Sequence, residues 1–194
     1  MNLPNKLTLA RCIMTPLFLA MMLIRFPHHY AVALLVFIIA SLTDYFDGKI
    51  ARSRNLITNL GKFLDPLADK ALTTAAYIGL VWKVDNESLP WVLFLVLIRE
   101  FAVTSVRLMA AKDGVVVAAS FAGKLKTVMQ MVSIIYALAY LEIKRYSFFC
   151  DVPYLKDICA VSAVVLLWIG VVATVVSGIQ YVWQLRHYFK ETTD

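Results

Sequence analysis

Long hydrophobic stretches separated by short polar breaks run along the whole chain. We expect these stretches to form helices, because backbone in contact with lipid must satisfy its own hydrogen bonds. The breaks contain prolines and clusters of polar residues, which are typical turn signals; they lie at residues 27–29, 85–90 and 142–156. The predicted helices span residues 7–25, 31–50, 65–83, 89–110, 120–141 and 157–185.

The composition indicates a membrane protein. Of the 194 residues, 61% are hydrophobic and 16% are charged, and the mean hydropathy is +0.74. A soluble domain of this length would carry more charge. Residues 158–185 contain no charged side chain, and this run is longer than the roughly 20 residues that a helix needs to cross a bilayer. The sequence therefore predicts an all-α integral membrane protein: one bundle of six transmembrane helices, with residues 1–194 as a single domain.

The distribution of positive charge predicts the orientation. An even number of helices places both chain ends on one side of the membrane, together with the connections at 51–64 and 107–124. Most of the 19 lysines and arginines lie on that side, and the positive-inside rule makes it the cytoplasmic side. The net charge of +6 suits an anionic membrane surface, and no motif indicates a nucleic-acid partner.

Four aspartates lie at the polar ends of the second and third predicted helices. Asp44 and Asp47 are three residues apart and Asp65 and Asp69 are four apart, so each pair shares one face of its helix. An ionised aspartate near the middle of a membrane costs about 2.5–3.5 kcal/mol. A divalent cation would offset this cost and the mutual repulsion, because Mg²⁺ and Mn²⁺ prefer oxygen ligands. We therefore expect two neighbouring helices to bring the carboxylates together around metal.

Two other interpretations of the aspartates stay open at this point. The carboxylates could pair with Arg52, Lys62 and Lys70 in a solvated cytoplasmic loop. Alternatively, they could line the path of a divalent-cation transporter. A transporter would favour acids near mid-membrane and a repeated half, whereas these acids cluster at one face.

Two glycines and an arginine accompany the aspartates. Gly48 and Gly61 have no side chain, so a ligand can approach the helix backbone closely there, although small residues also serve helix packing in membranes. Arg52 carries a fork of donors that suits a diphosphate. Together these residues form one motif: Asp44-xx-Asp47-Gly48-xx-Ala51-Arg52, then eight residues, then Gly61-xxx-Asp65-xxx-Asp69.

This motif resembles the signature of the CDP-alcohol phosphatidyltransferases at all of its positions. The resemblance implies a six-helix membrane enzyme, usually a homodimer, with a polar active-site cavity at the cytoplasmic side. Such an enzyme transfers a phosphatidyl group from a CDP-linked lipid to an alcohol and releases CMP.

The resemblance also implies roles for the matching residues. Two metal ions, Mg²⁺ or Mn²⁺, would be bound by Asp44, Asp47, Asp65 and Asp69. Asp69 would in addition be the base that deprotonates the attacking hydroxyl. The cytidine diphosphate would be contacted by Asp47, Gly48, Ala51, Arg52 and Gly61. Asn5 and Thr8 belong to a stretch that lines the nucleotide pocket in the family, although an amphipathic surface helix would also carry polar residues there.

The acceptor alcohol depends on a second set of residues. Lysines and arginines recur in two stretches, 99–114 and 123–127: Arg99, Arg107, Lys112, Lys124 and Lys126. Clustered Arg and Lys donors suit an acceptor that bears a phosphate. The same charges could also follow only the positive-inside rule and contact anionic lipid at the cytoplasmic surface. Glu100 is a candidate partner for Arg99 or Arg107.

These two stretches and NLPNKLTLAR at residues 2–11 resemble the family members that use CDP-diacylglycerol as donor and sn-glycerol 3-phosphate as acceptor. The resemblance implies that the glycerol phosphate is bound by Arg99, Arg107, Lys124 and Lys126. It also implies a multi-pass protein of the bacterial inner membrane, with termini and active site cytoplasmic and with membrane lipids and a second copy as partners. The alternative acceptors are inositol phosphate, serine and phosphatidylglycerol.

Overall fold

The computed structural model describes residues 3–53, 59–112, 121–146 and 153–184. Within these ranges, the side chains of residues 3–4, 44–53, 59–66, 69, 111–112 and 153 lie outside the description. All regular structure in the described ranges is helical: α1 (Leu3–Leu23), α2 (His29–Ser53), α3 (Asn59–Lys83), α4 (Leu89–Lys112), α5 (Phe121–Ile143) and α7 (Pro153–Gln184).

The predicted order of six helices is confirmed within the described ranges, but several boundaries differ. α3 begins at Asn59 instead of residue 65, because the polar residues around the second aspartate pair continue the helix. α7 begins at Pro153 instead of residue 157. Proline has a fixed φ and no backbone N–H, and both properties suit the first turn of a helix.

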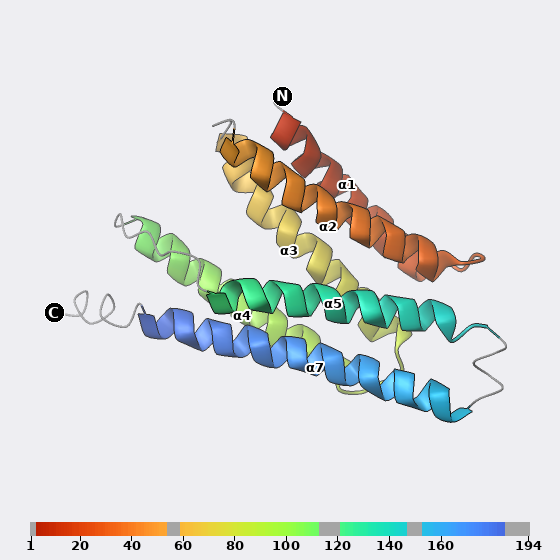
Figure 1. The fold of residues 1–194 in the computed structure, drawn as a ribbon. Coiled ribbons are helices and arrows are strands. Elements are labelled where there is room, and N and C mark those ends of the chain that lie inside the picture. Colours follow the sequence, from red (N-terminus) through yellow and green to blue (C-terminus); the bar gives the residue numbers. More distant parts are fainter. Residues whose placement is uncertain (1–2, 54–58, 113–120, 147–152, 185–194) are drawn as a thin grey trace.

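The helices form two groups (Figure 1). α1 packs along both α2 and α3, which have little direct contact with each other. In the second group α5 packs along α7, and α4 packs along α7 on another side. Contacts of α5 with α2 and of α4 with α3 connect the groups. In Figure 1 the groups diverge toward the left, where α1, α3 and α5 begin and α2, α4 and α7 end.

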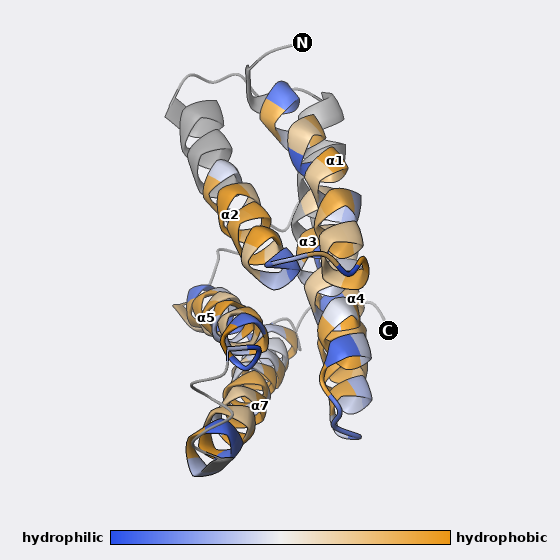
Figure 2. Cartoon of the chain, turned by 90° about the vertical axis from the view of Figure 1, so that its right-hand side faces the viewer, coloured by the Kyte–Doolittle hydropathy of each residue, from blue (hydrophilic) through white to orange (hydrophobic). Residues whose placement is uncertain are grey.

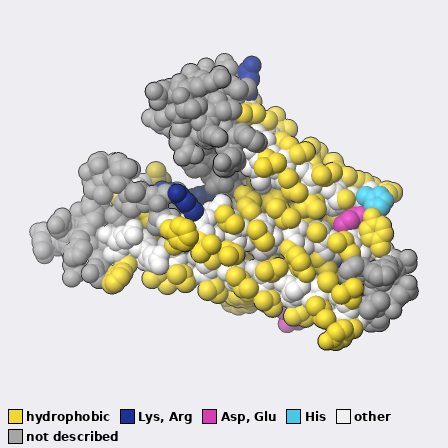
Figure 3. Space-filling view, viewed as in Figure 1, with side chains coloured by type: hydrophobic (Ala, Val, Ile, Leu, Met, Phe, Trp, Pro, Cys, Tyr) yellow, Lys and Arg dark blue, Asp and Glu magenta, His cyan; other side chains and the backbone are white. Residues whose placement is uncertain are grey.

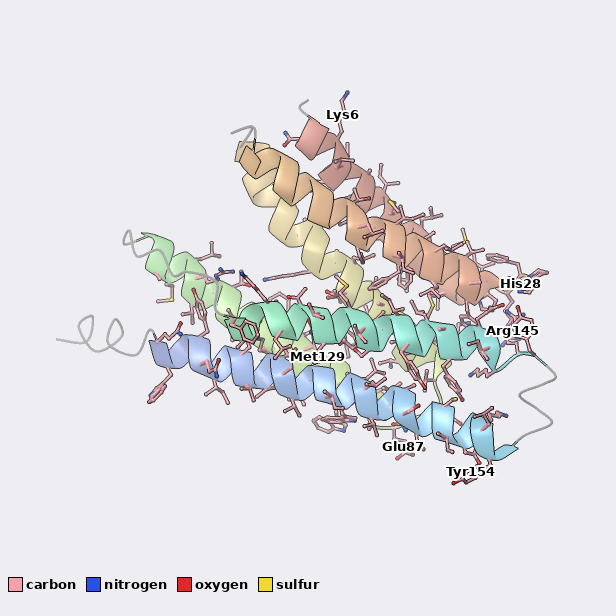
Figure 4. The ribbon with its side chains drawn as sticks, viewed as in Figure 1. Lys6, His28, Glu87, Met129, Arg145 and Tyr154 are labelled. Carbon is pink, nitrogen blue, oxygen red and sulfur yellow. The ribbon has the colours of Figure 1, made fainter. Side chains whose placement is uncertain are left out.

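A buried carboxylate fastens the opposite end of the bundle. The turn between α1 and α2 contains His28, whose φ of 57° lies in the left-handed region. Glu142, at the end of α5, is 7% exposed and lies 2.8 Å from Nδ1 of His28. Its other oxygen accepts a hydrogen bond from the backbone N–H of Ala31 at 3.3 Å, in the first turn of α2. Figure 4 shows His28 and Arg145 together at this end, far from Lys6.

The outward faces of the helices are hydrophobic, as expected for contact with lipid. α7 shows the pattern clearly because its two faces differ. The exposed face carries large apolar side chains: Ile158, Val161, Val165, Ile169, Val172, Val176 and Ile179. The buried face includes smaller and polar ones: Ala163, Thr174 and Ser177. Hydrophobic colour covers the helices in Figure 2 and most of the described surface in Figure 3.

Four of the described helices are long and apolar enough to cross a membrane: Asn5–Leu23, Leu89–Ala110, Phe121–Ile143 and Tyr154–Gln184. In α2 the part with described side chains contains an apolar stretch over His29–Thr43. Within the described part of the chain, these four helices bear out the prediction of a multi-pass membrane protein.

Gly79 sets the distance between α3 and α1. A Cβ atom at this position would lie 2.9 Å from Cε of Met22 on α1, and only the flexible end of that side chain can move away. We expect Gly79→Ala to be tolerated, because Met22 can adapt. Gly79→Val adds a branched side chain and should destabilise the protein by about 1–3 kcal/mol through overpacking. Thermal unfolding in detergent measures the effect, and Ile78→Val at the neighbouring exposed position is the control; equal melting temperatures for the two variants would contradict close packing at Gly79.

Candidate active site

The two aspartate pairs lie on helices that meet at one end of the bundle. Asp44 and Asp47 belong to the carboxyl-terminal part of α2, and Asp65 and Asp69 to the amino-terminal part of α3. Figure 1 shows both parts at the same end as the start of α1. Their side chains lie outside the described part of the structure, as do those of Gly48, Ala51, Arg52 and Gly61. The convergence of the four carboxylates therefore stays a prediction, which the helix positions allow.

α1 turns a polar face toward its neighbours at this end. Asn5, Thr8, Arg11 and Thr15 recur every three or four residues and are 6%, 1%, 1% and 8% exposed. Because α1 packs on both α2 and α3, this face lies inside the first helix group. Asn5 and Thr8 are thus buried, whereas a surface helix would expose them.

Arg11 is a residue that the sequence analysis did not select. It has the largest side chain among the fully buried residues, and a buried arginine needs charged or polar partners. The signal was present in the sequence, since Arg11 continues the spacing of Asn5 and Thr8 along one helical face. We therefore add Arg11 to the candidate site.

A second polar group surrounds Glu100 of α4. The Nη1 atom of Arg99 donates to Oε1 of Glu100 at 3.0 Å. Nζ of Lys126, from the first turns of α5, forms an ion pair with the same oxygen. The three side chains are only 11%, 18% and 12% exposed, in the order Arg99, Glu100 and Lys126. The structure thus brings together two predicted acceptor-site residues through a carboxylate between them.

Lys70 of α3, next to the last aspartate of the motif, also contacts this polar group. Its Nζ atom donates to the backbone carbonyl oxygen of Glu100 at 3.4 Å and also forms a hydrogen bond with Oγ1 of Thr104. Thr104 in turn donates to the same carbonyl at 2.7 Å. Lys70 directly follows Asp69 in the sequence, so the bond ties the aspartate-bearing part of α3 to α4. We call Lys70, Arg99, Glu100 and Lys126 the Glu100 cluster.

Arg99 also fastens α4 to α7. Its Nε atom donates to the backbone carbonyl of Thr174 at 2.9 Å, and Nη2 donates to Oγ of Ser177 at 2.9 Å. Gly178 provides the space, because a Cβ atom there would lie 3.0 Å from Cγ of Arg99. Thr174, Ser177 and Gly178 form a small polar face in an uncharged hydrophobic run, and that pattern in the sequence could have identified this contact.

The other predicted acceptor residues lie away from Arg99. Arg107 is exposed, and its guanidinium carbon lies 5.6 Å from the centre of the Tyr181 ring. It follows Arg99 by eight residues, which corresponds to about 12 Å along a helix. Lys124 is exposed in the first turn of α5. Arg107 lies in the carboxyl-terminal part of α4 and Lys124 at the start of α5, and Figure 1 shows both of these helix ends on the left.

Cavities formed by residues with described side chains include two of similar size. One of about 500 Å³ is a mainly apolar groove between α4 and α7, beside Arg99. The other, of about 480 Å³, lies at the opposite end near His28 and Glu142. The predicted polar cavity at the aspartates falls on side chains outside the described part.

Fold and site together define a multi-pass membrane protein with carboxylate and cationic groups on neighbouring helices. The sequence model of the CDP-alcohol phosphatidyltransferase family matches residues 1–176. The chain belongs to this family, which is generally dependent on a divalent metal.

Curated relatives match nearly the whole chain. A CDP-diacylglycerol–glycerol-3-phosphate 3-phosphatidyltransferase from Bacillus subtilis is 42% identical, with 93% of each chain covered. A protein of the same name from Rickettsia bellii is 37% identical, with 97% of each chain covered. A probable phosphatidylglycerophosphate synthase from Mycobacterium tuberculosis is 40% identical over 93% of this chain and 80% of the relative.

The donor set of the motif fits a hard divalent cation. The four motif positions supply carboxylate oxygens from two helices, and such oxygens are preferred by Mg²⁺ and Mn²⁺. Among the residues whose side chains are described, no group of three or more His, Cys, Asp or Glu gathers. That the motif aspartates bind the metal stays a prediction, which rests on their chemistry and spacing.

The contacts of Arg99 generate a prediction about stability. Arg99→Lys keeps the charge, but a single ammonium cannot reproduce the three directed contacts of the guanidinium. We expect a loss of about 1–3 kcal/mol, since buried polar partners on α4 and α7 are left unsatisfied. Thermal unfolding in detergent measures this loss. Arg107→Lys is the matched control, because Arg107 is exposed and a lysine retains the cation–π contact; an equally small effect at both positions would contradict the fastening role of Arg99.

Proposed function

We propose that this protein transfers the phosphatidyl group of CDP-diacylglycerol to sn-glycerol 3-phosphate and releases CMP. The observation that carries the proposal is the juxtaposition of the motif-bearing helices α2 and α3 with the cationic Glu100 cluster, linked by the contact of Lys70 with Glu100. One part suits a metal-bound diphosphate and the other suits a phosphate-bearing acceptor. The names of the relatives from Bacillus subtilis and Rickettsia bellii support the same donor and acceptor.

In the proposed mechanism, Asp44, Asp47, Asp65 and Asp69 hold two divalent ions, Mg²⁺ or Mn²⁺. Bound there, the ions would supply charge neutralisation of the diphosphate and of the departing CMP. Gly48 and Gly61 leave space for the nucleotide close to the helix backbone. Asp47, Ala51 and Arg52 complete the contacts on α2 and its end.

The buried polar face of α1, which packs on α2 and α3, is proposed to form another wall of the donor site. Asn5 and Thr8 lie between α2 and α3, so we propose that they border the cytidine. Arg11 lies one turn further along the same face and adds positive charge. Positioning of this kind matters because phosphoryl-type transfer depends mainly on alignment and charge stabilisation.

The chemical step exchanges one bond at phosphorus for another. The acceptor hydroxyl oxygen forms a bond to the phosphorus that carries the diacylglycerol, and the bond from that phosphorus to the bridging oxygen breaks. CMP leaves with the bridging oxygen. The proton of the hydroxyl goes to the carboxylate of Asp69, which acts as the general base.

We propose that the acceptor phosphate binds to Lys126, Arg107 and Lys124. Arg99 lies nearby, on the other side of Glu100 from the acceptor. Arg99 already donates to partners on α4 and α7, so its part is to hold the neighbouring groups. A phosphate monoester carries about −1.5 to −2 charges near neutral pH. The surplus of cations around Glu100 is complementary to that charge.

We propose the same cellular arrangement as the charge pattern predicts. The aspartate-bearing end of the bundle would face the cytoplasm, in a bacterial inner membrane, with a polar cavity open on that side. Residues 1–194 would form one domain, and two copies would associate into a homodimer. Membrane lipids surround the hydrophobic faces of the helices.

The function is tested by CMP release from CDP-diacylglycerol with Mg²⁺ and purified protein in detergent. Glycerol 3-phosphate should support release, whereas inositol phosphate, serine and phosphatidylglycerol should give only background. Release with another acceptor would keep the reaction class and refute the acceptor. No release with any acceptor, together with divalent-ion binding, would favour the transporter interpretation.

A second experiment tests the base. Asp69→Asn keeps the size of the side chain but removes most of its basicity, so turnover should fall by about 10²–10⁴-fold. The donor should still bind, because three motif aspartates and the nucleotide contacts remain. Equilibrium binding of CDP-diacylglycerol and CMP release together measure this separation. A variant that turns over at the full rate would refute the role of Asp69.

A further inference from the structure

A cavity of about 480 Å³ with charged walls lies at the end of the bundle that is far from the aspartate motif (Figure 4). Its described walls come from two places in the chain: residues 25–28 in the turn between α1 and α2, and Glu142, Arg145 and Tyr146 at the end of α5. The cavity therefore lies between the first helix group and the second. Its described walls contain no residue of the motif or of the Glu100 cluster, so the proposed reaction does not account for it.

Each of the two segments contributes one arginine to the cavity. Arg25 is exposed, and the side chain of Arg145 is 41% exposed. Within the part of the chain that the structure describes, Arg25 forms no ion pair, and the ion pair of Arg145 with Oε2 of Glu142 is long, at 4.0 Å. A guanidinium group carries five donors in a planar fork. Both arginines therefore offer donors to the cavity.

Glu142, the acidic residue among the described walls, is already engaged. Its Oε1 atom lies 2.8 Å from Nδ1 of His28. Its Oε2 atom accepts a hydrogen bond from the backbone N–H of Ala31 at 3.3 Å. The buried carboxylate thus holds the turn and the start of α2 in place, and the two arginines can donate to another anion.

The turn has a strained residue in the cavity wall. The φ of His28 is 57°, a left-handed conformation that is unfavourable for a residue with a Cβ atom and easy for glycine. The histidine at this position supplies the ring that contacts Glu142 and, at 3.3 Å, the hydroxyl group of Tyr146. Strained residues of this kind cluster at ligand sites. The strain and the contacts together keep the side chains of the turn beside the end of α5.

The cavity lies where the apolar surface of the helices ends. Ile24 and Ile143, which adjoin its walls in the sequence, are exposed. A phospholipid beside these helices would place its acyl chains on such apolar surface and its phosphate at the level of the arginines. Basic side chains at the end of an apolar helix commonly contact lipid headgroups in this way.

We propose that this cavity binds a phosphate group, to whose oxygens Arg25 and Arg145 donate hydrogen bonds. Its position at the edge of the apolar surface favours the phosphate of an anionic phospholipid over free inorganic phosphate. A phosphate bound there bridges the turn after α1 and the end of α5, and so stabilises the contact between the two helix groups. The site is separate from the candidate active site and goes beyond the proposed function.

Lipid binding to the full-length protein in detergent tests the proposal, with dioleoyl phosphatidylglycerol as the probe. Native mass spectrometry counts the bound lipids, and thermal unfolding measures the stabilisation that a ligand of the folded state produces. Arg25→Gln and Arg145→Gln should each weaken the binding of one lipid about tenfold, the loss expected for one charge-assisted contact. The double variant should lose this lipid, whatever binds elsewhere on the protein. A double variant that binds as many lipids as the wild type, with the same affinity, would overturn the proposal.

Lys156→Gln is the matched control, because it removes an exposed positive charge at the start of α7, outside the described walls of the cavity. This variant should bind the lipid like the wild type, and a loss equal to that of the arginine variants would show general surface attraction and overturn the proposal. If the glutamine double variant does not fold, the double variant Arg25→Lys with Arg145→Lys keeps both charges. It should still bind more weakly than the wild type, because an ammonium cannot form two parallel bonds to a phosphate; wild-type affinity would refute the arginine contacts.

Two further ligands separate the sources of the phosphate. Inorganic phosphate should neither displace the lipid nor raise the melting temperature; if it does both, and both effects require Arg25 and Arg145, the lipid assignment falls and the site takes free phosphate. Dioleoyl phosphatidylcholine, which is zwitterionic, should bind more weakly than the anionic lipid, and equal binding that the arginine variants leave unchanged would overturn the proposal. None of these readouts depends on CMP release, so their outcome is independent of the proposed function.

Discussion

A charge inside a membrane protein must have a partner, because lipid offers none and the charge cannot be left unsolvated. This constraint organises the interior of the bundle. Arg99, Lys126 and Lys70 enter it from three helices, and Glu100 is the group on which they converge. The side chain and the backbone carbonyl of Glu100 thus connect α4 with α5 and α3.

Carboxylates hold both ends of α5 to other helices. Near its beginning, Lys126 pairs with Glu100 of α4. Near its end, Glu142 accepts from the first turn of α2 and contacts His28. Between these points the helices pack through apolar and small side chains, which are much less directional. The polar contacts fix the register of α5, and the apolar contacts fill the space.

Much of this architecture could be predicted from the sequence, and the reasons are physical. Helices in lipid are recognised by long apolar runs and polar breaks. The order of the described helices was therefore predictable from the pattern. Their ends did not, because the helices continue into polar segments: α3 begins at Asn59 and α7 at Pro153. Within the described residues, four helices are long and apolar enough to span a membrane.

The site was predictable in part. The family was predicted from the motif, whereas the roles of its aspartates stay a prediction. Glu100 was expected to hold a neighbouring arginine, and it pairs with Arg99. The Glu100 carboxylate also pairs with Lys126, which lies 26 positions further along the chain. This pairing depends on how α4 and α5 pack, and no local sequence pattern encodes that packing. The same holds for the contact of Arg99 with Thr174 and Ser177. Arg11 was missed for another reason, since an arginine near a chain end looks like ordinary interfacial charge until its burial is known.

The length of α7 has a consequence for how the protein sits in its bilayer. Its uncharged part, residues 158–184, corresponds to about 40 Å of helix, against a hydrocarbon thickness of about 30 Å. An uncharged run longer than the hydrocarbon thickness keeps its apolar surface in lipid when the helix inclines. Arg99 fastens α4 to α7, so α4 inclines with it. Helices that lean differently from their neighbours separate at one end, and a lipid substrate would then enter sideways from the leaflet, with its acyl chains never leaving the hydrocarbon.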